Sequence, residues 1–185
     1  MGVTDGGPPR AAWSETPYDD AWRAFTARFA FHPRYSEPST VSSGPELPAV
    51  DEPPGALVLD LAPLFAADPA RFAAGVAAVE ASTARVLLDL AGDEELLALD
   101  WQHPAYRYSP QRLAVSGLRL PVPVFPDGDY YVHTPDDLRW GTFGHPWHQT
   151  LTLWGSELVD TLGVELATWL PVRHGGTHPG GPPQT

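Results

Sequence analysis

Cysteine and lysine are both absent from this chain of 185 residues, and each absence excludes a class of chemistry. Without cysteine there are no disulfide bonds, thiolate metal ligands or cysteine nucleophiles. Without lysine there are no Schiff bases and no lysine general bases, and all eleven cationic side chains are arginines. Isoleucine and asparagine are missing as well, which indicates a GC-rich gene from a high-GC bacterium.

Basic residues are scarce, because eleven arginines stand against 23 acidic residues and leave a net charge of −12. A chain this acidic repels nucleic-acid phosphates and anionic lipid headgroups, so neither a nucleic acid nor a membrane is an expected partner. No run of about 18 apolar residues could span a bilayer, and residues 1–9 lack a signal-peptide pattern. We therefore expect a cytoplasmic protein that binds a basic protein partner or a small-molecule ligand.

Two widespread functional motifs are also lacking. There is no Gly-x-Ser-x-Gly nucleophile elbow. There is also no glycine-rich phosphate-binding loop, because the glycine pairs lie near the chain ends rather than between a strand and a helix. The sequence therefore predicts no cofactor, and it leaves the oligomeric state open.

What is present predicts a single domain, since 43% of the residues are hydrophobic and the length suits one core. Residues 1–12 and 172–185 are rich in glycine and proline and are predicted to be flexible tails. The domain would then comprise residues 13–171. A Pro/Ser-rich stretch at residues 38–55 predicts a long loop within it.

Hydrophobic periodicity predicts an α+β fold. Apolar residues recur at helical spacing over residues 16–29, 68–92 and 156–169, with a cap residue before a proline at the first two starts. Short apolar or alternating runs predict strands at residues 58–61, 97–101, 122–124, 130–133 and 151–153. We expect a mainly antiparallel sheet with helices from both ends of the chain packed on it.

One turn is predicted in detail. Phe125-Pro126-Asp127-Gly128 fits a type I turn followed by a left-handed glycine. The strand at residues 122–124 would then pair with the strand at residues 130–133, and Gly128 would have a positive φ.

Polar residues that can carry chemistry gather between Asp100 and Trp154. If the protein is an enzyme, the candidate catalytic residues are Asp100, His103, Asp129 and His145, as acid–base groups without a cofactor. We expect Asp100, His103 and His145 to share one hydrogen-bond network. No metal site is predicted, because His145 and His148 are separated by Pro146 and fit no known ligand spacing; these two histidines are the weak candidates.

Aromatic residues are concentrated in the same stretch. Most must fill the core, but tyrosine and tryptophan interleaved with aspartate and histidine also describe a binding surface. The candidate binding residues are Trp101, Tyr108, Tyr130, Tyr131, Trp140 and Trp147.

Three phrases in one order are distinctive: DWQHPAY at residues 100–106, PVFPDGDYY at 123–131 and WGTFGHPW at 140–147. They resemble an uncharacterised bacterial family known as domain of unknown function 2716. The resemblance covers residues 13–163 loosely and 96–155 closely. It implies a single cytoplasmic domain and carries no activity with it.

Two functions remain open. The chain can be a protein-binding module of the immunity or antitoxin kind, which recognises a basic partner; this explains the charge and the absence of a catalytic signature. Alternatively, it is a small enzyme of secondary metabolism, cofactor-independent or metal-assisted, whose His/Asp/Tyr pocket performs acid–base catalysis. The first is favoured, because no motif requires chemistry.

Overall fold

The computed structural model describes residues 11–33 and 49–175, and its centre is one eight-stranded antiparallel sheet. The strand order is β1-β4-β3-β5-β6-β7-β2-β8. The strands are β1 (Trp13–Thr16), β2 (Leu57–Asp60), β3 (Leu96–Asp100), β4 (Ala105–Tyr108), β5 (Tyr131–Thr134), β6 (Gly141–His145), β7 (Thr150–Trp154) and β8 (Val172–Gly175). The expected α+β class with an antiparallel sheet is confirmed.

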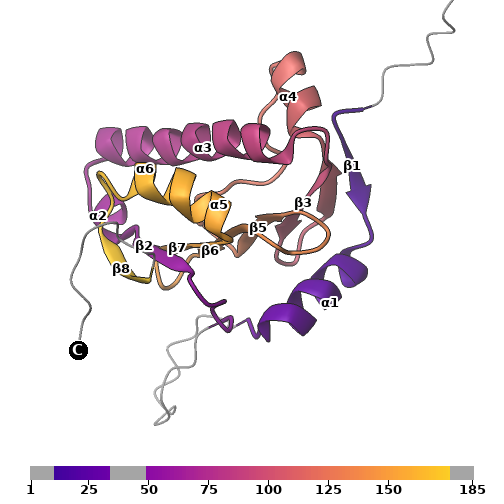
Figure 1. Cartoon of the computed structure of the whole chain (residues 1–185). Coiled ribbons are helices and arrows are strands. Elements are labelled where there is room, and N and C mark those ends of the chain that lie inside the picture. Colours follow the sequence, from indigo (N-terminus) through magenta and orange to yellow (C-terminus); the bar gives the residue numbers. More distant parts are fainter. Residues whose placement is uncertain (1–10, 34–48, 176–185) are drawn as a thin grey trace, which may run out of the picture.

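Helices cover both faces of the sheet (Figure 1). The long α3 and the C-terminal α5–α6 segment lie on one face, and the N-terminal α1 lies on the other. The helices are α1 (Tyr18–Phe29), α2 (Ala62–Phe65), α3 (Pro69–Ala91), α4 (Pro110–Ser116), α5 (Ser156–Leu158), the π-helical turn η1 (Val159–Gly163) and α6 (Val164–Leu166). Helices from both ends of the chain therefore pack on the sheet, as expected.

The first predicted helix is confirmed with a small shift at its start. Trp22, Phe25 and Phe29 lie at helical spacing and are all buried against the sheet. Pro17 is the N-cap rather than the first helical residue, and Thr16 closes strand β1. The helix ends at Phe29, and its C-cap Ala30 adopts a left-handed conformation with φ of 48°.

Helix α3 follows its predicted signals closely. The side chain of Asp68 accepts hydrogen bonds from the backbone N–H groups of Ala70 and Arg71, and Pro69 occupies the first turn, where no N–H is needed. Gly92, with φ of 54°, stands directly after the last helical residue. Both ends of this 23-residue helix are therefore encoded locally.

The central strands are buried on both faces, and alternation along β3 sorts its residues between two cores. Leu96 and Ala98 join the core under α3, whereas Leu97 and Leu99 join the aromatic core under α1. Because cross-strand partners share a face, the pairing of Asp100 with Tyr131 places both side chains on the α3 face.

The predicted hairpin around Gly128 is wrong. Residues 122–124 form no strand, and β5 pairs with β3 and β6 instead. Val122 and Val124 are buried under α3 as an irregular segment, held in part by the hydrogen bonds from Val124 and Phe125 N–H to Glu80. Gly128 is not among the described glycines with positive φ.

The domain boundary predicted at residue 171 also needs a correction. Residues 172–175 form the edge strand β8 against β2, so the structured part extends four residues further than expected. Residues 1–10, 176–185 and 38–48 of the predicted loop lie outside the described residues. Among the described helices, none has the length and apolar character needed to cross a membrane.

Candidate functional site

Asp100 stands where strand β3 ends and is the first residue of the candidate site. Its side chain keeps 20% of its surface exposed. The three residues before it are fully or almost fully buried, so the strand carries the carboxylate from the core to the rim of the sheet. A carboxylate in this position is partly dehydrated without being removed from solvent.

The tight turn after Asp100 brings His103 back over it. The N–H of His103 donates to the backbone oxygen of Asp100 at 3.3 Å. Gln102 adopts a left-handed conformation with φ of 66°, which is strained for a residue with a side chain. The N–H of Gln102 donates to the hydroxyl of Tyr18 at 3.1 Å, so α1 braces the strained turn.

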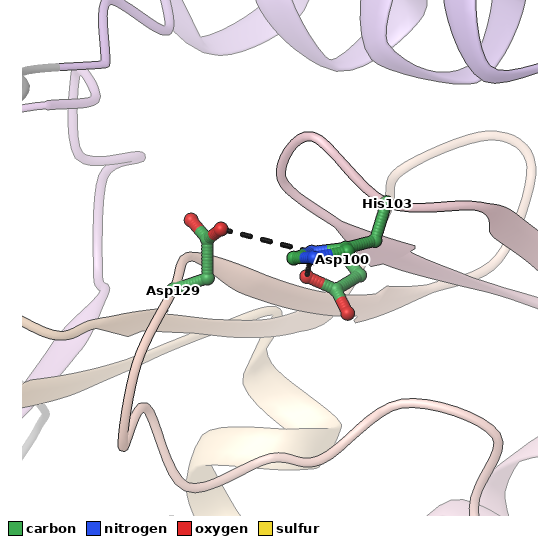
Figure 2. A group of neighbouring side chains, drawn as sticks. All are labelled: Asp100, His103 and Asp129. Carbon is green, nitrogen blue, oxygen red and sulfur yellow. Dashed lines mark hydrogen bonds and ion pairs between the residues drawn. The ribbon is translucent and has the colours of Figure 1, made fainter.

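The imidazole of His103 lies between two carboxylates (Figure 2). Its Nδ1 is 3.0 Å from Oδ1 of Asp100 and 3.1 Å from the backbone oxygen of Trp101. Oδ2 of Asp129 is 3.8 Å from the same nitrogen. Since both close neighbours are acceptors, Nδ1 carries the hydrogen and donates it. The ring itself is 61% exposed.

Asp129 reaches the site from the loop that precedes β5. Its Oδ1 accepts a hydrogen bond from the N–H of Tyr130 at 2.8 Å, and only 16% of its side chain is exposed. Asp127 lies nearby and accepts a weak hydrogen bond from the hydroxyl of Tyr131 at 3.4 Å. The pairing of β3 with β5 thus unites residues about thirty positions apart in the chain.

Burial and charge act in opposite directions at this site. Burial raises the pKa of the Asp100 carboxyl; the His103 side chain opposes this shift, and the charges of Asp129 and Asp127 add to it. Burial likewise raises the pKa of Asp129. The hydrogen bond and the charge of Asp100 raise the pKa of His103. The imidazole is therefore held closer to its cationic form.

Replacing Asp100 with asparagine tests this coupling. We expect the pKa of His103 to fall in Asp100→Asn, because the amide can still accept a hydrogen bond but carries no charge. NMR titration of the histidine side chains in the wild type and the variant measures the shift. Asp129→Asn should lower the pKa less, since that carboxylate is further from the ring. An unchanged His103 pKa in Asp100→Asn would show that the carboxylate is not its partner.

The same three side chains have the ligand geometry for a divalent cation. Their candidate ligand atoms all lie within 4.8 Å of one another. Two ligands about 2.1 Å from a tetrahedral metal ion are roughly 3.4 Å apart, and the distances of 3.0 and 3.8 Å from Nδ1 bracket that value. Asp100, His103 and Asp129 could therefore hold Zn²⁺ or Mn²⁺ once Nδ1 loses its proton.

The histidines singled out by the sequence lie elsewhere. His145 follows Phe143 by two residues in β6 and so faces the α1 side of the sheet, opposite to Asp100. The predicted network of Asp100, His103 and His145 is therefore wrong for His145. Its ring stacks on that of His148 at 3.8 Å with an interplanar angle of 7°. Lone pairs in two parallel planes do not converge on one ion, so this pair is poorly suited to a shared metal.

Most of the candidate binding aromatics belong to the core. Tyr108, Tyr130, Tyr131 and Trp140 are buried, so none of them offers a surface to a ligand. Trp101 is half-buried against Tyr18 and Trp22, and Trp147 is 41% exposed. A direct contact with a partner stays a prediction for Trp101 and Trp147.

Two ionisable residues, the buried His133 and the half-buried Glu80, were not expected from the sequence as fixed points of the fold. His133 on β5 accepts from the Tyr108 hydroxyl at 3.0 Å and donates to the backbone oxygen of Val122 at 3.1 Å. Glu80 on α3 accepts from two backbone N–H groups of the segment before Gly128. No local pattern in the sequence marked either residue, since α3 also carries Arg71, Arg85 and Asp89.

Comparison with known proteins gives a family and one curated relative. A family model described as "Protein of unknown function (DUF2716)" matches residues 12–159. The uncharacterized protein YxiI of Bacillus subtilis (strain 168) is 40% identical over 72 residues, which is 38% of this chain and 44% of that protein. The matched stretch thus spans less than half of the relative. No solved structure matches the chain.

Proposed function

This chain belongs to the family of the protein of unknown function DUF2716, and on that premise we propose a function from its own geometry. It is a small acidic protein of the cytoplasm and a binding module of the immunity or antitoxin kind. Its ligand is a basic protein partner. A cationic side chain of that partner, lysine or arginine, binds at the rim of the sheet between Asp100 and Asp129.

The observation that carries this proposal is how the arginines are distributed. Seven arginines within residues 11–33 and 49–175 form ion pairs with acidic side chains: Arg23, Arg71, Arg85, Arg107, Arg112, Arg139 and Arg173. None of these pairs includes Asp100, Asp127 or Asp129. In the described part of the chain, the cationic side chain within ion-pair distance of Asp100 and Asp129 is the imidazole of His103, and Asp127 forms no ion pair there.

This surplus of negative charge is held at a cost in free energy. Burial raises the pKa of both Asp100 and Asp129, so each carboxylate is less stable in the fold than in water. A guanidinium or ammonium group from outside would lower that cost. Groups kept in an unfavourable state by the fold are typical of binding sites.

A specific observation also favours the enzyme alternative. His103 is hydrogen-bonded to Asp100 as a general base is to the carboxylate that orients it, and this contact raises the pKa of the imidazole. However, within the described residues the imidazole borders an open hollow beside Tyr18 and Pro104. Such an open position does not exclude water from a reaction, and binding remains the better-supported function.

A charge-matched pair of variants tests the proposal. We expect Asp100→Asn/Asp129→Asn to weaken the binding of a fluorescent hexa-arginine peptide about tenfold in near-physiological salt, since two charges at one site are lost. The control Asp51→Asn/Asp93→Asn removes the same charge at two exposed positions and should weaken binding less than about twofold. Fluorescence anisotropy measures both.

The melting temperature separates binding from structure. Because burial disfavours both carboxylates, the Asp100→Asn/Asp129→Asn variant should melt at the same or a higher temperature than the wild type. A clear drop in melting temperature would identify the group as a structural brace. Equal peptide affinity in the two double variants would contradict the proposal, and so would a response to Zn²⁺ at this site without one to the peptide.

A further inference from the structure

A long apolar groove runs along the outer side of α3. Its other wall is formed by α4 and the irregular segment at residues 118–127, and its volume is about 1040 Å³. That is the size of a site that takes up most of a large ligand or one face of a peptide. The groove is lined by neither Asp100 nor His103, but Asp127 at one end of the groove lies near the Asp100 site.

The α3 side of the groove is a continuous helical face on which four alanines alternate with larger residues. Ala73, Ala77, Ala81 and Ala84 line it, and the lining extends from Phe72 to Leu88. Over this span, α3 rises by roughly 24 Å at 1.5 Å per residue. Alanines at this spacing leave the helix backbone accessible, so another backbone can approach it closely.

The facing wall is apolar as well. Leu113 of α4 contributes from the core side, and Leu118 just beyond α4 lines the groove with 52% of its surface exposed. Exposed leucine beside an uncovered alanine face is a surface that gains free energy when it is covered.

One half-buried carboxylate interrupts the apolar floor midway along α3. Oε1 of Glu80 accepts hydrogen bonds from the N–H groups of Val124 at 2.7 Å and Phe125 at 2.8 Å. Burial raises the pKa of Glu80, and the nearby charge of Asp127 raises it further. Glu80 thus fixes the facing segment and also carries negative charge into the groove.

The charges that line the groove leave a net negative balance. Arg85 is neutralised by its ion pair with Glu165. Glu80, Asp127 and Arg119 remain, two acids against one base, and the charge of Arg119 partly offsets that of Glu80. Asp127 also acts on the carboxyl of Asp100, so the acidic end of the groove adjoins the Asp100 site.

We infer that this groove binds one amphipathic helix of the basic partner, with its apolar face on the alanines of α3 and one lysine or arginine directed at Glu80 and Asp127. The inference rests on the proposed function and names the element of the partner that docks. Further basic residues at one end of the bound helix would reach Asp100 and Asp129.

The dimensions fit this occupant. A helix of about 16 residues matches the length of roughly 24 Å. A helix laid lengthwise would place its apolar face on the alanines of α3, as in other helix-in-groove complexes.

Three peptides and two matched variants test the inference. The probes are a 16-residue Leu/Ala/Lys amphipathic helix, a peptide with the same residues in shuffled order, and a version with the groove-facing Lys replaced by Gln. Ala77→Phe fills the groove, whereas Ala78→Phe adds the same ring on an exposed part of α3 that does not line it. We expect Ala77→Phe to weaken binding of the amphipathic peptide at least about tenfold and Ala78→Phe less than about twofold.

A separate variant tests the contact between Glu80 and the lysine of the peptide. Glu80→Gln keeps an oxygen for the two backbone N–H groups but removes the charge, so it should weaken binding of the Lys peptide several-fold and leave the Gln peptide almost unaffected. A nitroxide on the bound peptide should broaden the NMR methyl signals of Leu113 and Leu118. Circular dichroism verifies that each variant is folded.

The outcomes separate this inference from the proposed function. Equal binding of the amphipathic and shuffled peptides, or equal affinity in Ala77→Phe and Ala78→Phe, would overturn the groove inference. The proposed function would still stand if hexa-arginine binding depended on Asp100 and Asp129. Uptake of a neutral apolar dye that the Lys peptide cannot displace would identify a small-molecule site and also overturn the inference.

Discussion

Replacing Gly155 with alanine is expected to destabilise the protein by roughly 3–5 kcal/mol, through backbone strain and overpacking together. Gly155 joins β7 to α5 with φ of 85° and ψ of 126°, a conformation that residues with a Cβ rarely adopt. A Cβ here would lie 2.8 Å from Cα of Trp140 and 2.9 Å from the backbone oxygen of Arg139, and it would also strike Cβ of Trp140. Chemical denaturation measures the loss.

Gly117 provides the control that isolates the steric part. It has φ of 63° at the end of α4, and nothing lies within 4 Å of a Cβ added there. Gly117→Ala should therefore cost only the strain of a left-handed alanine, about 1–2 kcal/mol. If both variants lost the same free energy of unfolding, the close approach of Gly155 to Trp140 would be unimportant.

Acidification from pH 6.5 to pH 4 is expected to remove roughly 3 kcal/mol of stability through His133 alone. Burial lowers the pKa of this imidazole from 6.5 to about 4. A depressed folded-state pKa means that the contribution is fully present above the unfolded pKa and is lost as the pH falls through the folded one. Burial is the main cause, because the charged imidazole would lose its water; in addition, Nδ1 accepts from the Tyr108 hydroxyl, so a proton added there would face a donor.

His133→Gln separates this effect from that of the acidic residues. Glutamine can both accept and donate at this position but does not titrate, so its unfolding free energy should lack the loss between pH 6.5 and pH 4. Glu80, Asp100 and Asp129 have raised pKa values and act in the opposite direction, with stability lost as the pH rises through them. They contribute equally to both proteins. If the difference in unfolding free energy between the wild type and His133→Gln did not change with pH, the prediction would be contradicted.

Elements with local signals were predictable from the sequence. Asp68 and Pro69 fix the start of α3 through side-chain and backbone geometry within four residues, and Gly92 fixes its end. The stripe of Trp22, Phe25 and Phe29 similarly defined α1. In each case, the information lies within one or two helical turns.

The segment before Gly128 was not predictable in the same way. Val122 and Val124 alternate like strand residues, yet Pro121 and Pro123 remove the N–H groups that a strand ladder needs. The two valines are buried because α3 covers them and Glu80 binds the backbone, both of which depend on residues some forty positions earlier. The alternation of Val122 and Val124 thus predicted correctly that both valines are buried, but predicted wrongly that they form a strand.

The residues of the candidate site also differ in whether local sequence or strand pairing places them. Asp100 and His103 are three residues apart, so a turn alone brings them together. Asp129 was named from its residue type, but its approach to His103 follows from the β3–β5 pairing. His145 could not be assigned to a face without the register of β6, and one position of register decides that face.

The sheet has one further consequence, which concerns the ends of the described chain. β1 and β8, the first and last strands in sequence, form its two opposite edges. Seven inter-strand steps of about 4.8 Å separate them in a twisted sheet, so the two ends are roughly 30 Å apart. Energy transfer between dyes attached at Ser14 and Arg173 would measure the distance between the two edge strands. It would therefore report whether all six strands between them remain paired.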